Sequence, residues 1–390
     1  MASLSPQHAL VALNLLPRIG PVRVQRLLQC FEHPAEILGA SLQRLMQADG
    51  IGPEMAQILH QWEDHCDLSR ELTEAERRGL ALLTRYDAAY PESLRQIYDQ
   101  PLVLYVWGEI QPRDRHAVAI VGSRRATHYG QQCTKMLSYQ LATAGVTILS
   151  GLARGIDTLA HEAALAAQGR TIAVIGSGLA RLYPPENMPL AEKIASGHGA
   201  IVSEFPLFTR PDKTTFPQRN RLVAAWSRAL LVTECPAWSG ALITANLANE
   251  YGRPVFAVPG PITQATSAGC HQLIRDGATL CSDAHDILSE LDQFSFVTAS
   301  NDVPSKISKA NSTSTHSTTS ARAVGASAQA PPSLNEQEAA IFAHISDMET
   351  PIDRLIELSQ LPAGVVTSTL LKLELRQLVR ALPGFRYVRR

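Results

Sequence analysis

The stretch VAIVGSRRATHYG, residues 118–130, joins four apolar, strand-forming residues to a turn that begins with glycine. Five further apolar runs follow, with room for a helix between them, at residues 146–149, 171–175, 200–203, 229–233 and 255–258. Continuous apolar strands that alternate with helical segments are typical of a parallel sheet covered by helices on both faces. The sequence therefore predicts an α/β domain with a Rossmann-like, doubly wound parallel sheet over residues 85–295.

Composition limits the class of protein. The chain has 390 residues, of which 45% are hydrophobic and 18% charged, as in a globular protein of two or three domains. The formal net charge is −1, so a nucleic-acid partner would have to be bound by locally clustered arginines and lysines. The six cysteines form no CxxC pair, which predicts no metal site and no disulfide framework, and favours a reducing cytoplasmic compartment. The chain begins with no secretory signal pattern, and its apolar runs are too short to span a bilayer, so no membrane partner is expected.

The segments on either side of the α/β domain differ from it. Residues 1–75 look helical, and the turn GIGP at residues 50–53 fits a helix-hairpin-helix, in which glycines let backbone N–H groups approach a phosphate of duplex DNA. A plain turn between two helices explains it equally well. Residues 297–333 are rich in Ser, Thr and Ala and lack aromatic residues, which predicts a flexible linker.

The last segment, residues 334–390, indicates three helices (residues 335–346, 351–359 and 363–376) followed by a hairpin, the order of a winged-helix domain. No cation lies near the start of the third helix, so readout of bases by this helix is not expected. The arginines of the tail could contact a DNA backbone. A protein-interaction role is equally defensible.

Small residues follow several of the predicted strands, where a doubly wound sheet binds its ligands. They are Gly122-Ser123, Gly151, Gly176-Ser177-Gly178, Ser239-Gly240 and Pro259-Gly260. A single such loop could reflect turn chemistry alone. Repeated along one edge of the sheet, they indicate a row of backbone N–H donors and helix N-termini that suits anions.

Arginines sharpen this prediction. Arg124, Arg125 and Arg154 precede predicted helices, and Arg219 and Arg221 lie in the first turn of another. Cations at helix N-termini oppose the helix dipole, so a bound polyanion would explain their repetition there. The nearby Phe216 could stack on a base, which is worth about 1–3 kcal/mol in single-strand binders, or it could belong to the core.

Two other readings are weaker. A dinucleotide cofactor would require GxGxxG where residues 122–130 read GSRRATHYG, and an acidic residue at the end of the second strand. Catalysis could use Asp157, His161 or Glu234, but no nucleophile elbow such as GxSxG is present. Asp157 is better explained as a brace for its loop, with His161 packed beneath. No cofactor and no enzymatic activity are predicted.

The ordered motifs of the α/β domain resemble the DprA/Smf family, the DNA-processing proteins of bacterial natural transformation. The resemblance covers about 200 residues and extends to the lead-in at residues 90–108. It rests on VAIVGSR (118–124), SGLARGIDTLAH (150–161), YPPEN (183–187), SEFP (203–206), FPQRNR (216–221), SGALITA (239–245), GRPVFAVPG (252–260) and LIRDGA (273–278). The flanks look like the helical and winged-helix modules of that family.

The resemblance implies a cytoplasmic homodimer that binds and protects incoming single-stranded DNA and loads the RecA recombinase. It implies DNA contacts along the glycine-rich edge and a dimer surface near Leu273, Ile274 and Leu280. The expected DNA-binding residues are Gly122, Ser123, Arg124, Gly151, Arg154, Lys213, Phe216, Arg219, Asn220, Arg221, Ser239 and Gly240.

Two departures bear on this resemblance. The chain has His271 where the family usually has Asn, and Thr233-Glu234-Cys235 where it has VEA. These differences affect details near the fifth strand and the dimer helix. A related group of nucleotide phosphoribohydrolases uses PGGxGTxxE, but SGALITA at residues 239–245 lacks the glutamate, which argues against hydrolase activity.

Overall fold

The structure is a computed structural model that describes residues 4–292, 336–346, 349–375, 378–382 and 386–389. The described parts form two compact units, which divide between residues 294 and 295. The predicted linker, residues 297–333, lies outside the described residues.

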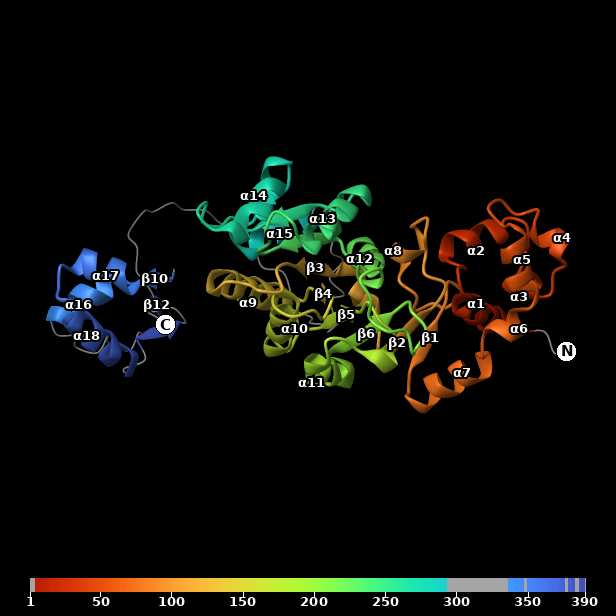
Figure 1. Cartoon of the computed structure of the whole chain (residues 1–390), viewed down its shortest axis with the longest axis horizontal. Helices are drawn as coiled ribbons and strands as arrows, with labels where there is room; N and C mark the ends of the chain where they lie inside the picture. The colour runs from red at the N-terminus through yellow and green to blue at the C-terminus, as the bar shows by residue number, and fades with distance from the viewer. Residues whose placement is uncertain (1–3, 293–335, 347–348, 376–377, 383–385, 390) are drawn as a thin grey trace, which may run out of the picture. The chain divides into compact units, whose positions relative to one another are not determined.

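The first part of the chain is helical, as predicted (Figure 1). Its helices are α1 (Pro6–Leu15), α2 (Pro21–Leu27), α3 (Pro34–Leu38), α4 (Leu42–Leu45), α5 (Pro53–His60), α6 (Trp62–His65) and α7 (Leu68–Arg77). Helices α1, α2, α3 and α5 each begin with proline, which suits a first helical position because the N–H there has no partner within the helix.

These helices pack onto the α/β domain rather than standing apart from it. Their buried side chains share one core with residues of that domain, among them Val103, Tyr105 and Leu207. Polar contacts cross the same boundary. Asn14 Nδ2 donates to the Glu204 carbonyl (3.0 Å), and the Glu71 carboxylate accepts from the Leu207 N–H (2.8 Å).

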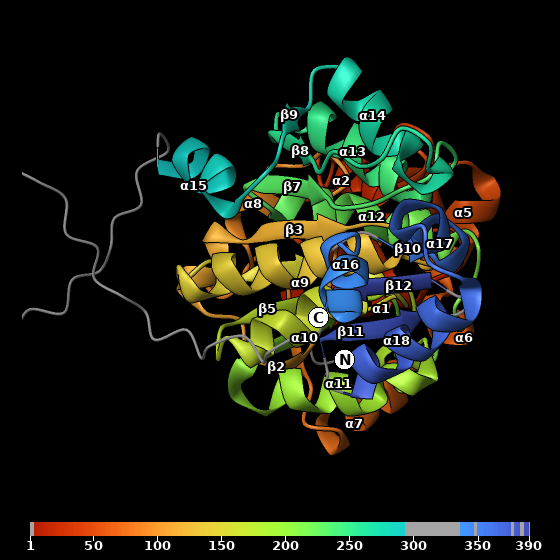
Figure 2. The same cartoon turned by 90° about the vertical axis from the view of Figure 1, so that its left-hand side faces the viewer.

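A nine-stranded sheet organises the α/β domain, in the order β1-β2-β6-β5-β4-β3-β7-β8-β9. The strands are β1 (Ala81–Leu83), β2 (Leu104–Gly108), β3 (Val118–Val121), β4 (Ile148–Ser150), β5 (Thr171–Val174), β6 (Gly199–Ser203), β7 (Ala229–Val232), β8 (Val255–Ala257) and β9 (Thr279–Leu280). From β6 to β9 all pairings are parallel, whereas β1 and β2 run antiparallel at one edge. Figure 2 shows the sheet extending from β8 and β9 to β2.

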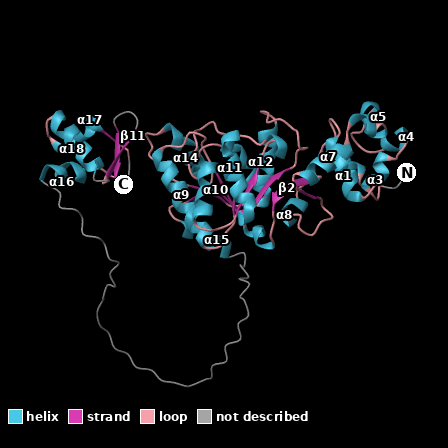
Figure 3. Cartoon of the chain, turned by 90° about the horizontal axis from the view of Figure 1, so that it is seen from below, coloured by secondary structure: helices cyan, strands magenta, loops and turns pink. Residues whose placement is uncertain are grey.

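Helices cover both faces of this sheet (Figures 1 and 3). Helices α9 (His128–Thr143) and α10 (Ile156–Ala166) pack together on one face, and α12 (Thr215–Trp226) and α13 (Gly240–Glu250) on the other. The remaining helices are α8 (Glu92–Arg95), α11 (Met188–Lys193), α14 (Ala268–Arg275) and α15 (Ala284–Asp292), with short 3₁₀ segments η1 (Pro112–His116), η2 (Leu179–Arg181), η3 (Pro185–Asn187) and η5 (Ala265–Ser267) and a π-helical turn η4 (Ile194–His198). The predicted Rossmann-like fold is confirmed.

The strand order reverses beside β3. The chain passes from β3 through β4 and β5 to β6, then returns to place β7 on the other side of β3. The loops after β3 and β7 therefore diverge at their carboxyl ends, where open α/β sheets bind ligands. This places the segments after residues 121 and 232 at the centre of the candidate site.

The second unit has the element order of a winged helix. It contains α16 (Glu336–Ala343), β10 (Thr350–Pro351), α17 (Ile352–Ser359), α18 (Ala363–Leu375), β11 (Val379–Leu382) and β12 (Arg386–Arg389). The strands form a sheet in the order β10-β12-β11, and a small core that includes Ile341, Leu355 and Leu370 holds the helices together.

Candidate nucleic-acid interface

The loop after β3 folds back onto the end of β7. The Ser123 N–H donates to the Glu234 carbonyl (2.7 Å), and Ser123 Oγ accepts from the Arg125 N–H (3.0 Å). A β-carbon on Gly122 would lie 2.7 Å from the same Glu234 carbonyl oxygen, so only glycine allows this close approach. The loop presents Arg124 and Arg125 to solvent.

The carboxylate of Glu234 occupies the N-terminus of α9. It accepts from the N–H (3.1 Å) and the hydroxyl (2.7 Å) of Thr127, the N-cap residue. Gly130 lies directly against it, because a β-carbon there would overlap a carboxylate oxygen. The anion that the α9 dipole favours is thus supplied by the protein itself, and the arginines of the β3 loop are left to face outward.

The loop after β4 is braced by Asp157, as the sequence predicted. The Asp157 carboxylate accepts from the N–H groups of Gly151 (3.1 Å) and Ala153 (3.3 Å). Burial raises the pKa of Asp157, while the nearby Arg219 and these hydrogen bonds lower it. Arg154 lies at the exposed part of this loop.

Arg219 lies beneath the loop rather than on an open surface. It is buried, and its Nη1 donates to the carbonyl of Gly151 (2.7 Å) and to that of Val174. Burial lowers the pKa of Arg219 to about 10, which Asp157 partly opposes. A side chain on Gly151 would overlap the guanidinium. This glycine therefore makes room for the protein's own arginine.

Two arginines and two aromatic rings form a continuous array. The guanidinium of Arg124 lies 5.3 Å from the Phe216 ring, and that of Arg154 lies 5.9 Å from the Tyr183 ring. The ring centres of Tyr183 and Phe216 are 6.0 Å apart. We call these four residues the arginine–aromatic array. A small pocket at their centre is also lined by Gly151, Ala153, Pro184 and Arg219.

The YPPEN segment completes the array. Glu186 forms an ion pair with Arg154, and this hydrogen bond lowers the pKa of Glu186. Asn187 Nδ2 donates to the Leu152 carbonyl (2.8 Å), which ties this segment to the β4 loop. Sequence reasoning gave Tyr183 and Glu186 no role in binding, although the YPPEN motif was the signal that could have singled them out.

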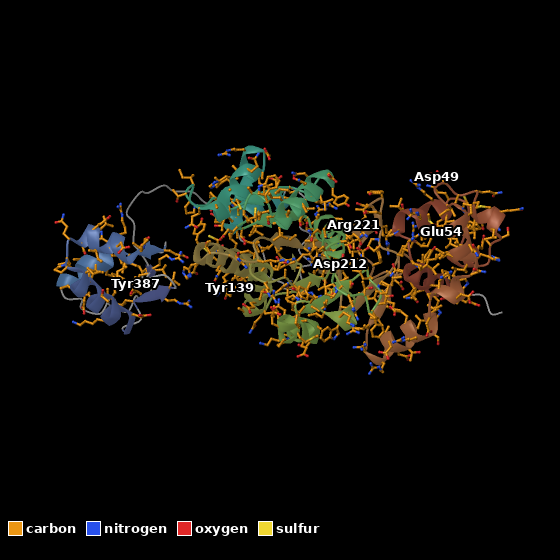
Figure 4. All side chains as sticks on the ribbon, viewed as in Figure 1. Asp49, Glu54, Tyr139, Asp212, Arg221 and Tyr387 are labelled. Carbon is orange, nitrogen blue, oxygen red and sulfur yellow. The ribbon has the colours of Figure 1, made fainter. Side chains whose placement is uncertain are left out.

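Lys213 is exposed in the loop that leads from β6 to α12. The turn around it is held by Asp212, whose carboxylate accepts from the N–H (2.9 Å) and hydroxyl (2.7 Å) of Thr214 (Figure 4). Arg210 of the same loop is also exposed. Because β6 is parallel to β5, this loop belongs to the same edge of the sheet as the array.

The start of α13 adjoins α12 through Asn220. Its side chain accepts from Arg219 Nε (3.2 Å) and lies 3.5 Å from the Gly240 carbonyl, so it links α12 to the first turn of α13. Ser239 caps α13 through the Ala241 N–H, and nothing lies within 4 Å of a β-carbon on Gly240. Trp238, which sequence reasoning did not consider, is 95% exposed.

Arg221 does not join the other predicted residues. It forms ion pairs with Asp99 (3.1 Å) and with Glu204, and all three side chains are largely buried. Residues two positions apart point about 200° away from each other on a helix, so Arg219 and Arg221 cannot face the same groove. Burial raises the pKa of Glu204 to about 6, and Arg221 opposes this shift.

His161 is not placed to act as a base in the pocket. It is fully buried, and its Nδ1 lies 2.6 Å from the hydroxyl of Thr171 at the start of β5. Burial, with a further contribution from Arg219, lowers the pKa of His161 to about 3. Its imidazole is therefore neutral at physiological pH and serves packing.

The helix-hairpin-helix candidate carries charges that the sequence reading did not weigh. Gly52 leads into α5, and nothing lies within 4 Å of a β-carbon on it. Two carboxylates flank the turn, where Asp49 pairs with Arg26 (3.1 Å) and Glu54 with Arg18 (2.5 Å) (Figure 4). Both acids would repel a phosphate unless their arginine partners remain close.

The residues expected at a dimer surface differ in exposure. Leu273 is buried in the core and Ile274 is half-buried, whereas Leu280 is 47% exposed on the edge strand β9. His271, in the helix that carries the first two, lies 2.9 Å from the Gly260 carbonyl through Nε2.

Among the described residues, no helix is long and apolar enough to cross a membrane, and no three potential ligands gather into a metal site.

Comparison with known proteins identifies the family. A model described as DNA recombination-mediator protein A matches residues 81–292, and one described as the DprA winged helix domain matches residues 325–384. Protein Smf of Synechocystis is 35% identical over 396 residues, 99% of both chains. This chain belongs to the DprA/Smf family. Both the family and the winged-helix domain predicted from sequence are confirmed.

Solved structures agree with this assignment. The X-ray structure of DNA processing protein A from Streptococcus pneumoniae has a TM-score of 0.64 and 33% identity, covering 74% of this chain and 98% of that one. A structure of the Helicobacter pylori protein, described as giving insight into its single-stranded DNA binding mode, has a TM-score of 0.50 and 32% identity, covering 55% and 96%. The family places this chain among proteins of DNA processing and recombination.

Proposed function

We propose that the carboxyl edge of the sheet binds single-stranded DNA, with its centre at the arginine–aromatic array. The observation that carries this proposal is the array itself, in which Arg124 and Arg154 lie on aromatic rings at the point where the strand order reverses. Guanidinium groups bind phosphate oxygens, while aromatic faces accept unpaired bases. The single-strand binding described for the Helicobacter pylori relative supports it.

Phosphates would be held by the exposed cations around the array, Arg124, Arg154 and Lys213. Arg219 adds positive charge from below without leaving its carbonyl partners. Arg221 was also predicted to contact DNA. Its charge is already neutralised by the carboxylates of Asp99 and Glu204, so we omit it from the proposed interface.

Binding of a fluorescent dT oligomer, followed by anisotropy over a range of salt concentrations, tests this proposal. Each phosphate neutralised on a single strand contributes about −0.7 to the slope of log K against log salt. The double variant Arg124→Ala/Lys213→Ala should therefore bind more weakly and lose about 1.4 from the size of that slope. Lys135→Ala/Lys193→Ala removes two exposed cations from α9 and α11 and is the matched control. Equal affinities and slopes for both double variants would reject this site.

Trp238 extends the proposed path toward α13. A freely exposed indole next to Ser239 suits stacking on a base of a strand that leaves the pocket. Trp62 and Trp107 are half-buried and Trp226 is buried, so quenching of tryptophan fluorescence by a dT oligomer should come mainly from Trp238. Trp238→Phe should remove most of the quenching while anisotropy still reports binding. Quenching that survives this substitution would exclude Trp238 from the path.

We further propose that the protein delivers single strands to RecA, as its family implies, and that the second unit contacts a protein partner. The chain divides into compact units at residues 294 and 295, so a chain that ends at residue 333 retains the whole α/β domain. It should bind dT oligomers normally but support less RecA filament formation on them. Full RecA loading by the shortened chain would assign that role to the first unit.

A homodimer is proposed through β9 and α14, with Leu280 as the exposed contact. Leu280→Lys should shift the mass measured by light scattering toward the monomer. Leu42→Lys, at a leucine of similar exposure (41%) in α4, is the control and should leave the mass unchanged.

A further inference from the structure

A second cavity lies at the opposite edge of the sheet from the arginine–aromatic array. Three parallel strands begin just after residues that line it, since β3 follows His116, β7 follows Arg228 and β8 follows Arg253. Its volume is about 640 Å³, within the range of roughly 300–1,000 Å³ typical of small-molecule sites. We call it the amino-edge cavity.

Arginines dominate the charged lining of the amino-edge cavity. They are Arg95, Arg115, Arg228 and Arg253, and His116 lies among them. The lining contains two carboxylates, and both already have cationic partners. Glu92 pairs with Arg95 (3.1 Å), and Asp114 pairs with the buried Arg170 (2.8 Å) behind the wall. Four arginines against these two carboxylates give the lining an excess of positive charge.

These cations lie close enough to affect one another. Burial lowers the pKa of Arg253, and Arg228 lowers it further. The pKa of His116 is lowered by burial and then by Arg115 and Arg228. One Arg253 nitrogen, Nη2, donates to the Ala225 carbonyl (3.1 Å), but its Nε is buried without a partner. A bound anion would relieve this repulsion.

Helix dipoles explain part of this arrangement. Arg228 and Arg253 follow the C-termini of α12 and α13, where a cation gains about 0.3–1 kcal/mol. That gain does not restore the lowered pKa of Arg253, and it does not account for Arg115, which lies in the short 3₁₀ segment η1. The excess charge therefore calls for a ligand.

The rest of the lining is apolar and includes Ala88, Ala89, Pro91, Ile110, Pro112 and Trp226. We propose that the amino-edge cavity binds a nucleotide, with its phosphate against Arg115, Arg228 and Arg253 and its base against this apolar wall. Arginine forks match phosphate oxygens in pairs, and the volume suits one nucleotide. The nucleotide can be free in solution or part of a DNA strand, because both offer the same phosphate and base.

Isothermal titration of the full chain with thymidine 5′-monophosphate tests this proposal, with thymidine and inorganic phosphate as partial ligands. The nucleotide should bind more tightly than phosphate, and thymidine should give no detectable binding. Arg115→Glu should weaken nucleotide binding at least about tenfold, equivalent to 1.4 kcal/mol. Arg115 is exposed, so this substitution spares the fold. Arg113→Glu, two residues away, exposed and outside the lining, should change affinity less than about twofold.

Other outcomes would overturn the proposal. Equal affinity for phosphate and nucleotide would show a general anion site. Equal effects of Arg113→Glu and Arg115→Glu would show that only the overall positive charge of this region attracts the nucleotide. Loss of nucleotide binding in Arg124→Ala/Lys213→Ala would move the site to the array.

The source of the nucleotide follows from binding of a labelled dT oligomer to Arg115→Glu. Oligomer affinity that falls together with nucleotide affinity identifies a DNA strand as the ligand. Unchanged oligomer affinity identifies a free nucleotide.

Discussion

Helix α12 separates two regions in which a buried arginine has different partners. On one side, Arg219 is held by two backbone carbonyls beneath the arginine–aromatic array. On the other, Arg221, only two residues later, is held by the carboxylates of Asp99 and Glu204. Carbonyl dipoles hold the guanidinium in place but leave its charge, whereas carboxylates cancel it. The positive field at the carboxyl edge thus depends on which side of α12 an arginine faces.

The largest expected difference between the two regions is in stability. Arg221→Met leaves Asp99 and Glu204 buried together without a cation, which should cost about 3–5 kcal/mol. Arg219→Met loses carbonyl hydrogen bonds but also removes a charge whose burial lowers its pKa to about 10. These effects oppose each other, so its cost should stay within about 2 kcal/mol although Arg219 is the more buried. Urea unfolding measures both values. A larger loss for Arg219→Met would show that the carbonyl contacts dominate.

A second difference concerns pH. His161, near Arg219, has a pKa lowered from 6.5 to about 3, so the stability gained by keeping it neutral is present above pH 6.5 and is lost as pH falls. Glu204, beside Arg221, has a pKa raised from 4.5 to about 6, so its contribution is lost as pH rises through that window. Between pH 4.5 and 6 the two slopes are opposite, each about 1.4 kcal/mol per pH unit at most.

Single substitutions should expose the two slopes. In His161→Gln the free energy of unfolding should fall as pH rises from 4.5 to 6, and in Glu204→Gln it should rise. The wild-type chain and the double variant should both be flatter, as measured by urea unfolding across this range. If the free energy of unfolding changes with pH in the same direction in both single variants, the two groups do not have opposite effects.

The sequence predicted most of the strands and the edge of the sheet where the candidate site lies. The six apolar runs became β3 to β8 because strands buried on both faces need uninterrupted apolar residues. Strands β1, β2 and β9 were not predicted, although residues 102–107, which run into β2, are uninterrupted apolar residues and carry the same pattern. Strand β9 has only two residues, too few to show it. The strand ends then predicted the carboxyl edge as the site, since parallel strands all end there.

Partners distant in sequence could not be predicted. Nothing in the sequence around Arg221 indicates that Asp99, which is distant in the chain, will pair with it. Glycines were equally ambiguous. A β-carbon on Gly176 would lie 2.8 Å from the Phe216 ring, so this glycine, like Gly151, makes room for a side chain of the protein. Composition alone cannot distinguish such a glycine from one that faces a ligand.

The smallest effect concerns a carboxylate that pairs with an arginine of the array. Glu186 pairs with Arg154, so this arginine must exchange a carboxylate for a phosphate when DNA binds. Exposed pairs of this kind are weak, so Glu186→Gln should raise affinity for a dT oligomer only about two- to threefold. It should also make the salt dependence steeper, because Arg154 would neutralise a phosphate at no cost to an existing pair. Glu192→Gln, at an exposed carboxylate of α11, is the control for net charge. If both substitutions raise the affinity for the oligomer equally, the gain comes from the change in net charge alone. The contrast between arginines that a carboxylate neutralises and arginines that keep their charge would then not apply to this exposed pair.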